Sequence, residues 1–273
     1  MQDQFDKAVL LYRRAKYKAC SKACKTITFS DPNFHPAYAL GAQAFVALGQ
    51  IKRAEKFLRR SVELQPNIAT GHLNLGIFYS QSGFNKKADK AFRTSLQIEP
   101  ENPETLYAYG IYLYEKKFAK DALVCFLAAC KIAPQKLESW IGLADSYRSM
   151  GELDDARGAC LSALEFDSNY LPALNNYGAL STEMGDFEAA IKIFRRSSVS
   201  NPEQSQVWYN LGVCYVRAEK FDQAITVLKK GNSIAPNSTE ILECLGKSYQ
   251  RQKEYESAIS AFRRAYEIDP EIP

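Results

Sequence analysis

The chain has 273 residues, of which 46% are hydrophobic and 24% are charged. This composition is typical of an ordinary folded protein and excludes a low-complexity or disordered chain. Lysine and arginine together number 35 against 31 aspartate and glutamate residues, which gives a formal net charge of +4 spread along the whole sequence. Because no half of the chain is set apart as a basic arm, we expect no nucleic-acid partner.

The cysteines and the longest apolar run indicate the cellular location that we expect for the chain. Seven cysteines show no regular spacing, and the N-terminus does not resemble a signal peptide. We therefore expect reduced thiols and a cytoplasmic location, because disulfides form mainly in oxidising compartments. The longest apolar run extends only from Ala122 to Cys130, well short of the roughly 20 residues that a membrane helix needs. We expect no membrane segment.

Prolines recur at intervals of 34 residues. They are Pro32, Pro66, Pro100, Pro134, Pro202, Pro236 and Pro270, and only Ser168 interrupts the series. A fixed period of this length is the signature of a repeat architecture. With proline at repeat position 32, the repeats start near residues 1, 35, 69, 103, 137, 171, 205 and 239. These repeats account for nearly every residue, so we predict a single domain over residues 1–273.

Each repeat is expected to form two helices of about a dozen residues. Apolar residues at positions 4, 7, 8 and 11 form one stripe, and those at positions 20, 24 and 27 form another. Glycines mark the turn between the two helices in four repeats, namely Gly49, Gly83, Gly151 and Gly185. The proline then follows the second helix, because proline cannot continue it.

The first repeat, residues 1–34, departs most from this pattern, since Lys7 stands where an apolar residue is expected. It is either a capping unit or a divergent edge. Its Cys20 and Cys24 are four residues apart on one helix face, a spacing that could hold a metal. They occupy core positions, however, and the only histidines are His35 and His72. We therefore interpret the two cysteines as packed thiols and predict no metal site.

From the second repeat to the eighth, position 8 always carries a small residue. These residues are Ala42, Gly76, Gly110, Ala144, Gly178, Gly212 and Gly246. Glycine inside an exposed helix costs about 1 kcal/mol relative to alanine, so its recurrence needs a packing reason. We predict that position 8 lies against the small residue at position 20. The bulky residue at position 24 is expected to fill the space toward the neighbouring hairpin.

The seventh repeat, which starts near residue 205, carries the fullest motif. It contains Trp208, Leu211, Gly212, Tyr215, Ala224 and Pro236. These residues reproduce the pattern W-x2-L-G-x2-Y, then A, then P, so the chain resembles the tetratricopeptide repeat family over its whole length. The resemblance implies an all-α fold, a right-handed α-solenoid of about eight stacked helix-turn-helix hairpins. It also implies that the first helices line a concave groove.

The resemblance further implies which residues bind a partner, because positions 2, 5, 6, 9, 12 and 13 of the first helix line the groove in this family. The candidates here are Asn74, Tyr107, Tyr114, Arg148, Asn175, Asn176, Tyr209, Asn210, Arg217 and Lys247. Asparagine offers both a donor and an acceptor to the backbone of an extended peptide, and tyrosine and arginine are enriched at binding hot spots. We expect a protein or an extended peptide as the partner.

Catalytic motifs are missing from the sequence. Neither His35 nor His72 has a serine or cysteine partner at a diagnostic spacing, and phosphate-binding loops, zinc-protease helices and calcium loops are absent. We predict no catalytic residue and no cofactor, and hence a scaffold or adaptor rather than an enzyme. Basic pairs at positions 25 and 26 could bind an acidic surface, but we interpret them as a solvated outer helix face. They are Arg59-Arg60, Arg195-Arg196, Lys229-Lys230 and Arg263-Arg264.

The eighth repeat, which starts near residue 239, is not followed by the polar capping helix that solenoids usually carry. We expect Ile259, Phe262 and Ile268 to leave apolar surface exposed. Two hypotheses follow from this expectation. The chain is the substrate-recruiting arm of a larger enzyme, such as a glycosyltransferase, a sulfotransferase or a hydroxylase, or this end self-associates with another copy.

Overall fold

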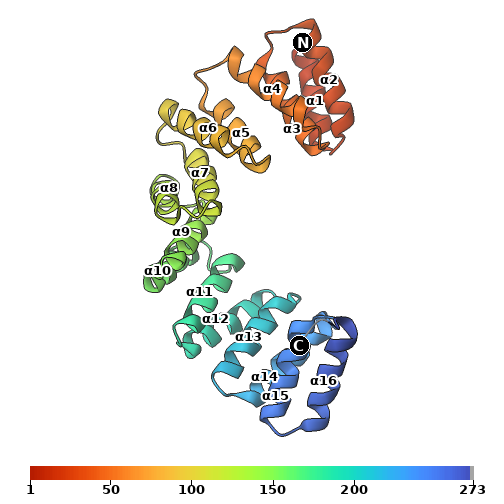
Figure 1. Cartoon of the computed structure of the whole chain (residues 1–273), viewed down its shortest axis with the longest axis vertical. Coiled ribbons are helices and arrows are strands. Elements are labelled where there is room, and N and C mark those ends of the chain that lie inside the picture. The colour runs from red at the N-terminus through yellow and green to blue at the C-terminus, as the bar shows by residue number, and fades with distance from the viewer. Residues whose placement is uncertain (271–273) are drawn as a thin grey trace. The chain divides into compact units, whose positions relative to one another are not determined.

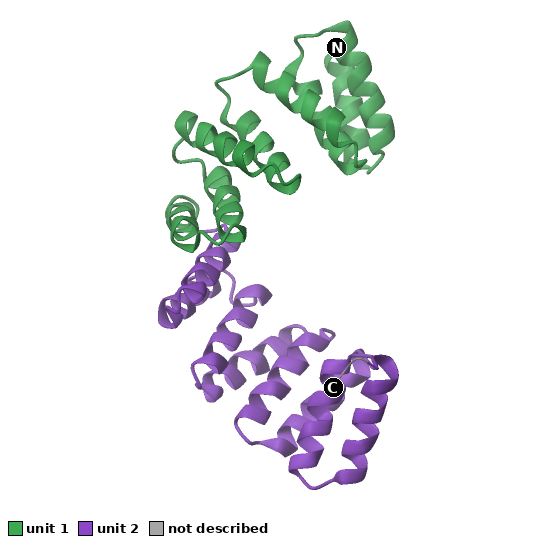
Figure 2. Ribbon diagram, viewed as in Figure 1, with its two compact units in different colours: residues 1–133 green, residues 134–273 purple. Residues whose placement is uncertain are grey.

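The computed structural model describes residues 1–270 and divides the chain into two compact units, residues 1–133 and 134–273 (Figures 1 and 2). The described residues form sixteen α-helices and contain no strand. None of these helices combines the length and the apolar character that crossing a membrane requires.

Each unit consists of four helical hairpins. The first unit contains α1 (Gln2–Arg13), α2 (Tyr17–Ser30), α3 (His35–Ala47), α4 (Ile51–Leu64), α5 (Ala69–Gln81), α6 (Asn85–Ile98), α7 (Pro103–Glu115) and α8 (Ala119–Ile132). The second unit contains α9 (Leu137–Ser149), α10 (Leu153–Phe166), α11 (Leu171–Glu183), α12 (Phe187–Ser200), α13 (Ser205–Arg217), α14 (Phe221–Ile234), α15 (Thr239–Arg251) and α16 (Tyr255–Ile268).

The helix boundaries follow the 34-residue spacing of the sequence. From the second hairpin on, the first helices begin at residues 35, 69, 103, 137, 171, 205 and 239. The second helices begin at residues 17, 51, 85, 119, 153, 187, 221 and 255. The predicted all-α fold of eight helical hairpins is therefore confirmed. A single domain over residues 1–273 stays a prediction.

The turn inside each hairpin uses a left-handed backbone conformation at repeat position 15. Gly49, Gly83, Gly151 and Gly185 adopt it with φ between +67° and +82°. The other four hairpins place Ala15, Lys117, Glu219 and Lys253 there with φ between +55° and +67°. Residues with a Cβ are strained in this region, so packing of the two helices imposes the turn even where glycine is missing.

The loop that joins one hairpin to the next is tied to the following first helix. Trp140 Nε1 donates a hydrogen bond to the carbonyl oxygen of Pro134 (2.9 Å), and Trp208 Nε1 donates to that of Pro202 (2.8 Å). His72 Nε2 lies 2.8 Å from the carbonyl oxygen of Pro66, at the same repeat position as the tryptophans. These contacts satisfy carbonyls near the end of the second helix and give His72 a structural role.

The small residue at position 8 makes room for a ring of its own hairpin. A Cβ atom added to Gly76 would lie 2.7 Å from the ring of Phe92, and one added to Gly178 would lie 2.3 Å from Phe194. Phe92 also contacts Tyr109 of the next hairpin, with 5.4 Å between ring centroids. Position 24 therefore reaches the neighbouring hairpin as predicted. The atoms nearest to the added Cβ belong to position 24, so this residue limits the size of position 8 in these hairpins. The predicted contact of position 8 with position 20 stays a prediction.

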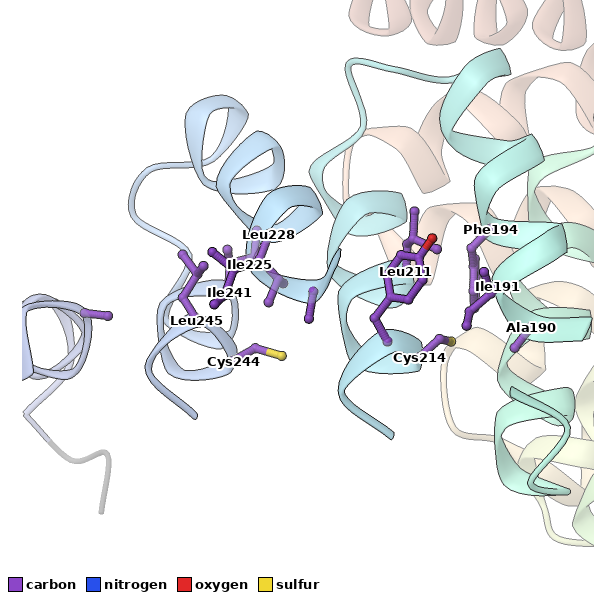
Figure 3. Packing of buried hydrophobic residues seen from close by; sticks show 13 residues of the cluster. Ala190, Ile191, Phe194, Leu211, Cys214, Ile225, Leu228, Ile241, Cys244 and Leu245 are labelled. Atoms are coloured by element: carbon purple, nitrogen blue, oxygen red, sulfur yellow. The ribbon is translucent and has the colours of Figure 1, made fainter. Parts of the chain in front are cut away.

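Stacked hairpins share a continuous core inside the second unit. One buried cluster extends from Ala190 and Phe194 on α12, through Leu211 on α13 and Leu228 on α14, to Leu245 on α15 (Figure 3). All five of these residues are at most 4% exposed. A single hairpin cannot bury both of its apolar faces, so each one depends on its neighbours for stability.

Gly178→Ala should destabilise the chain. The added methyl group overpacks against the buried Phe194 ring at a cost of about 1 to 3 kcal/mol, which exceeds the gain of about 1 kcal/mol in helix propensity. We expect a lower midpoint in urea unfolding followed by circular dichroism.

Gly158→Ala in α10 is the matched control, since nothing lies within 4 Å of a Cβ added there. That variant should gain about 0.5 to 1 kcal/mol. An equal response of the two variants would contradict the packing account.

Candidate partner-binding groove

The first helices of the second unit pack more closely on one another than the second helices do. Contacts join α9 to α11, α11 to α13 and α13 to α15, whereas second helices of successive hairpins scarcely touch. The unit therefore curves with its first helices on the inside. We call the side formed by α9, α11, α13 and α15 the inner face, and the side formed by α10, α12, α14 and α16 the outer face.

Two polar contacts bridge α9 and α11. Asn176 Nδ2 donates a hydrogen bond to Asp145 Oδ1 at 3.1 Å. Arg148 Nη2 forms an ion pair with Glu183 Oε2 at 2.8 Å, although both side chains remain more than 40% exposed. Surface ion pairs contribute little stability, so the main effect of these contacts is to fix the orientation of the polar groups.

Acceptor groups in this region are short of hydrogen-bond donors. Burial raises the pKa of Asp145, and the charge of Arg148 and the hydrogen bond from Asn176 oppose that rise. On α11, the buried Oδ1 of Asn175 accepts no hydrogen bond within the described part of the chain. A ligand that brings an N–H or ammonium donor to the Asp145 carboxylate would recover part of its desolvation cost, whereas the Asn175 oxygen is buried out of a ligand's reach.

A pocket of about 610 Å³ opens between α13 and α15. Tyr209, Arg217 and Lys247 line it, together with the apolar Val213 and Phe221. Its other charged residues are Glu219, Glu240, Glu243 and Arg251, so three basic groups face three acidic ones. The lining is thus neutral in sum and mixed in sign, which suits a polar ligand with an apolar part.

Most charges in this pocket are already paired. Lys247 Nζ lies 3.0 Å from Glu243 Oε2, and Arg251 lies 3.6 Å from Glu219 while stacking over the Phe221 ring at 5.2 Å. Arg217 makes no ion pair with any residue that the structure describes. It is therefore the cation most available to a ligand.

Tyr209 forms a fixed part of the wall. It packs against the buried cluster of the second unit, and burial, followed by the charges of Cys244 and Glu240, raises the pKa of its hydroxyl. A tyrosine held in this way presents its contact surface at low cost in conformational entropy. Asn210, one residue further along α13, accepts a hydrogen bond from Gln206 of the same helix at 3.0 Å.

The remaining candidates lie in the first unit. Asn74 lines a pocket of about 260 Å³ with Gln43 and Gln81. The Tyr107 ring lies 6.0 Å from that of Phe126, in the contact between α7 and α8. Tyr114 is half-buried near the end of α7. Of the three, Asn74 faces a cavity and Tyr107 packs within its hairpin.

Two family models match the sequence. The model described as the middle TPR-like domain of Cilia and flagella-associated protein 70 matches residues 38–166, and that of Anaphase-promoting complex, cyclosome, subunit 3 matches residues 183–265. The crystal structure of a tetratricopeptide repeat protein from Parabacteroides merdae is 18% identical with a TM-score of 0.64, and the match covers 86% of this chain and 93% of that one. The chain belongs to the tetratricopeptide repeat family.

Two further solved structures share the fold at a similar level of sequence identity. pilF from Pseudomonas aeruginosa is 19% identical with a TM-score of 0.63, covering 80% of this chain and 97% of that one. The APC/C hetero-tetramer Cut9-Hcn1 is 19% identical with a TM-score of 0.57, covering 97% of this chain and 52% of that one. The present chain thus spans about half the length of that structure. The search among curated proteins gives no match.

The sequence of this tetratricopeptide repeat protein predicted all of these residues as members of one groove. The structure brings Arg148 and Asn176 to the contact between α9 and α11, and Tyr209, Arg217 and Lys247 to one pocket. The prediction missed Glu219, in the turn before α14, and Phe221, the first residue of α14. No first-helix periodicity could have indicated them. In the folded chain the guanidinium of Arg251 packs over the Phe221 ring at this pocket.

The cysteines of the tetratricopeptide repeats are all buried, as expected for packed thiols. Burial raises the pKa of Cys24 and of Cys160 to about 12 and that of Cys244 to about 11. Thiols with such values stay protonated near neutral pH and are poor nucleophiles. Within residues 1–270, no three histidine, cysteine, aspartate or glutamate side chains are arranged to hold a metal ion.

The Asp145 carboxyl should titrate above the ordinary aspartate value of about 3.9. Between its unfolded and folded pKa values the folded chain binds more protons than the unfolded chain, so this group lowers stability as the pH rises through that window. Asp145→Asn should remove this effect, and the variant should gain stability relative to the parent chain over the same window. Carbon-detected NMR titration and urea unfolding at several pH values measure both quantities. A titration at or below the ordinary value would show that the carboxyl is solvated.

Proposed function

We propose that the chain is a protein-interaction scaffold that holds a segment of a partner protein on the inner face of its second unit. The observation that carries this proposal is the pocket between α13 and α15, in which Arg217 and the aromatic Tyr209 line one cavity with apolar side chains. Arginine and tyrosine are the residue types that contribute most to binding when they lie in such a pocket.

The two polar regions of the inner face suit an extended segment. Asp145 and Asn176 between α9 and α11 offer acceptors to peptide N–H groups or to a basic side chain. Further along, Arg217 offers charge-assisted hydrogen bonds to a carboxylate, and Val213 and Phe221 offer contacts to an apolar side chain. The partner segment would then carry a donor-rich part and an acidic part, separated by the width of one hairpin.

Proteins with this fold occur in multi-chain assemblies, and that favours a scaffold. The Cut9-Hcn1 structure is a hetero-tetramer of the APC/C, and one family model describes a subunit of the anaphase-promoting complex. The proposal for this chain still depends on its own inner face. The substrate-recruiting arm of a larger enzyme and a cytoplasmic location stay predictions.

Asn176→Ala combined with Asn210→Ala should weaken partner binding. Each substitution removes an amide from the inner face, and a lost hydrogen bond costs about 1 kcal/mol, so the Kd should rise about tenfold or more in all. A partner protein is first captured from an extract with the parent chain. Its affinity for the parent chain and for the double variant is then measured by calorimetric titration.

The matched control replaces Asn67 and Asn237 by alanine, since both asparagines are exposed in loops. The control should bind and melt as the parent chain does. The Asn176 and Asn210 variant should melt somewhat lower, because Asp145 loses the hydrogen bond from Asn176, but it should remain folded at the temperature of the titration. Unchanged affinity in the Asn176 and Asn210 variant would place the partner elsewhere.

The candidate surface for the predicted self-association is one face of α16 in the second unit. Tyr255, Ile259 and Tyr266 on this helix are between 58% and 60% exposed, and they recur at the spacing of one helix face. We propose that this face pairs with a second copy. The parent chain should then show a mass that rises with concentration in light scattering, and Ile259→Glu should abolish the rise. A parent chain that stays monomeric at every concentration would contradict this pairing.

A further inference from the structure

Two large apolar side chains stand out by their exposure. Phe29 is 90% exposed and Val199 is 81% exposed, more than any other large apolar residue between residues 1 and 270. Both occupy repeat position 29, near the ends of α2 and α12. The other six repeats place a polar residue at this position, namely Glu63, Gln97, Lys131, Glu165, Ser233 and Glu267. Phe29 and Val199 are therefore the two apolar residues at a position that is polar in every other repeat.

Val199 borders an open pocket of about 460 Å³ on the outer face of the second unit. The pocket lies between α12 and α14, and Trp208 on α13 and Val227 on α14 contribute further apolar lining. The Trp208 ring is held in place, because its indole N–H donates to the Pro202 carbonyl. A preformed apolar pocket of this size accepts one or two bulky side chains.

Basic groups flank this pocket. Arg195 and Lys230 both line it, and Lys230 Nζ lies 5.0 Å from the centre of the Trp208 ring. The one carboxylate in the lining is Asp222, which accepts a hydrogen bond from Gln252 at 2.9 Å. Two cations against one carboxylate make the lining basic. An acidic ligand fits it better than a neutral or basic one.

The first unit carries an equivalent pocket of about 500 Å³. Its lining residues lie 170 positions earlier in the sequence, which is five repeats of 34. Tyr38 therefore corresponds to Trp208, Phe57 to Val227 and Arg60 to Lys230. The same displacement relates Phe29 to Val199. Both sites combine an aromatic residue at position 4 and a bulky apolar residue at position 23 with an apolar residue at position 29 of the preceding repeat. No other repeat of the sequence has this combination.

The equivalent pocket is basic as well. Lys52, Lys56, Arg59 and Arg60 line it against Glu55 and Glu63. Lys87 is bound to Glu55 at 3.1 Å, which neutralises one of the two carboxylates. Both residues of the basic pair Arg59-Arg60 thus line the first-unit pocket, and Arg195 and Lys230 come from two further basic pairs of the sequence.

We propose that these two outer grooves, one in each unit, bind acidic segments of partner proteins that carry a bulky apolar side chain. The outer groove of the second unit consists of Arg195, Val199, Trp208, Val227 and Lys230. The apolar side chain would enter between Val199, Trp208 and Val227, and neighbouring carboxylates would pair with Arg195 and Lys230. This binding is independent of the inner face, since the outer groove shares no lining residue with the pocket between α13 and α15.

A display library of random fifteen-residue segments tests the proposal, with the full chain as target. Enriched segments should carry a net negative charge and a leucine, isoleucine or aromatic residue. A synthetic copy of an enriched segment should bind the Arg60→Glu, Val199→Glu double variant, which changes one lining residue of each pocket, at least tenfold more weakly than the parent chain. Its affinity for the parent chain should also fall as salt rises.

Val124→Glu is the matched control, because Val124 on α8 is also exposed (64%) but borders neither pocket. This control and the Asn176→Ala, Asn210→Ala variant should keep the full affinity for the segment, which separates the outer grooves from the inner face. In proton-nitrogen NMR spectra the indole signal of Trp208 should shift on binding, and that of Trp140 should stay in place.

The proposal is overturned if no segment is enriched, if the enriched segments are neutral or basic, or if they bind the double variant as tightly as the parent chain. Displacement of the segment by vesicles of anionic lipid or by duplex DNA, with higher affinity than the segment itself, would assign the grooves to those ligands instead.

Discussion

In most hairpins of this chain, a first helix lies directly against the ring or branched side chain at position 24 of the second helix. Phe194 fills the space above Gly178, and Leu228 fills that above Gly212. An alanine in place of either glycine would bring atoms into contacts that real structures do not show. This contact sets the separation of the paired helices, and the turn between them follows. Even Lys117 and Glu219 are drawn into a left-handed backbone conformation.

The stacking of the hairpins creates two different faces in the second unit. The first helices α9, α11, α13 and α15 contact one another in order, and the second helices are left apart. Polar groups on the inner side can then bridge neighbouring hairpins, as Asn176 does with Asp145. On the outer side, the wider spacing between α12 and α14 leaves the Trp208 ring accessible at the base of a pocket. Both candidate binding surfaces are consequences of how the hairpins stack.

The two faces differ in the ligands that they favour. The pocket between α13 and α15 balances acidic and basic groups, most of them paired, and Arg217 is the group most available. The outer pocket has a basic lining and an exposed apolar rim at Val199. A scaffold with two such faces can hold two partner segments of different chemistry without competition. Its affinity for a partner that contacts both would then exceed either alone.

The sequence by itself determined the repeat length, the sixteen helices and the small residues at position 8, because each of these depends on local periodicity and on backbone sterics. The resemblance to the tetratricopeptide repeat family, rather than any spacing, assigned Tyr209, Arg217 and Lys247 to one groove, and that assignment stays a prediction. Only the tertiary structure decided that the side chain at position 24 lies nearest to the glycine of position 8 and limits its size. It also decided that Phe221 joins the inner pocket and that Val199 and Trp208 share an outer one. Those juxtapositions depend on how far successive helices diverge, which is a property of the packed stack and not of any single repeat.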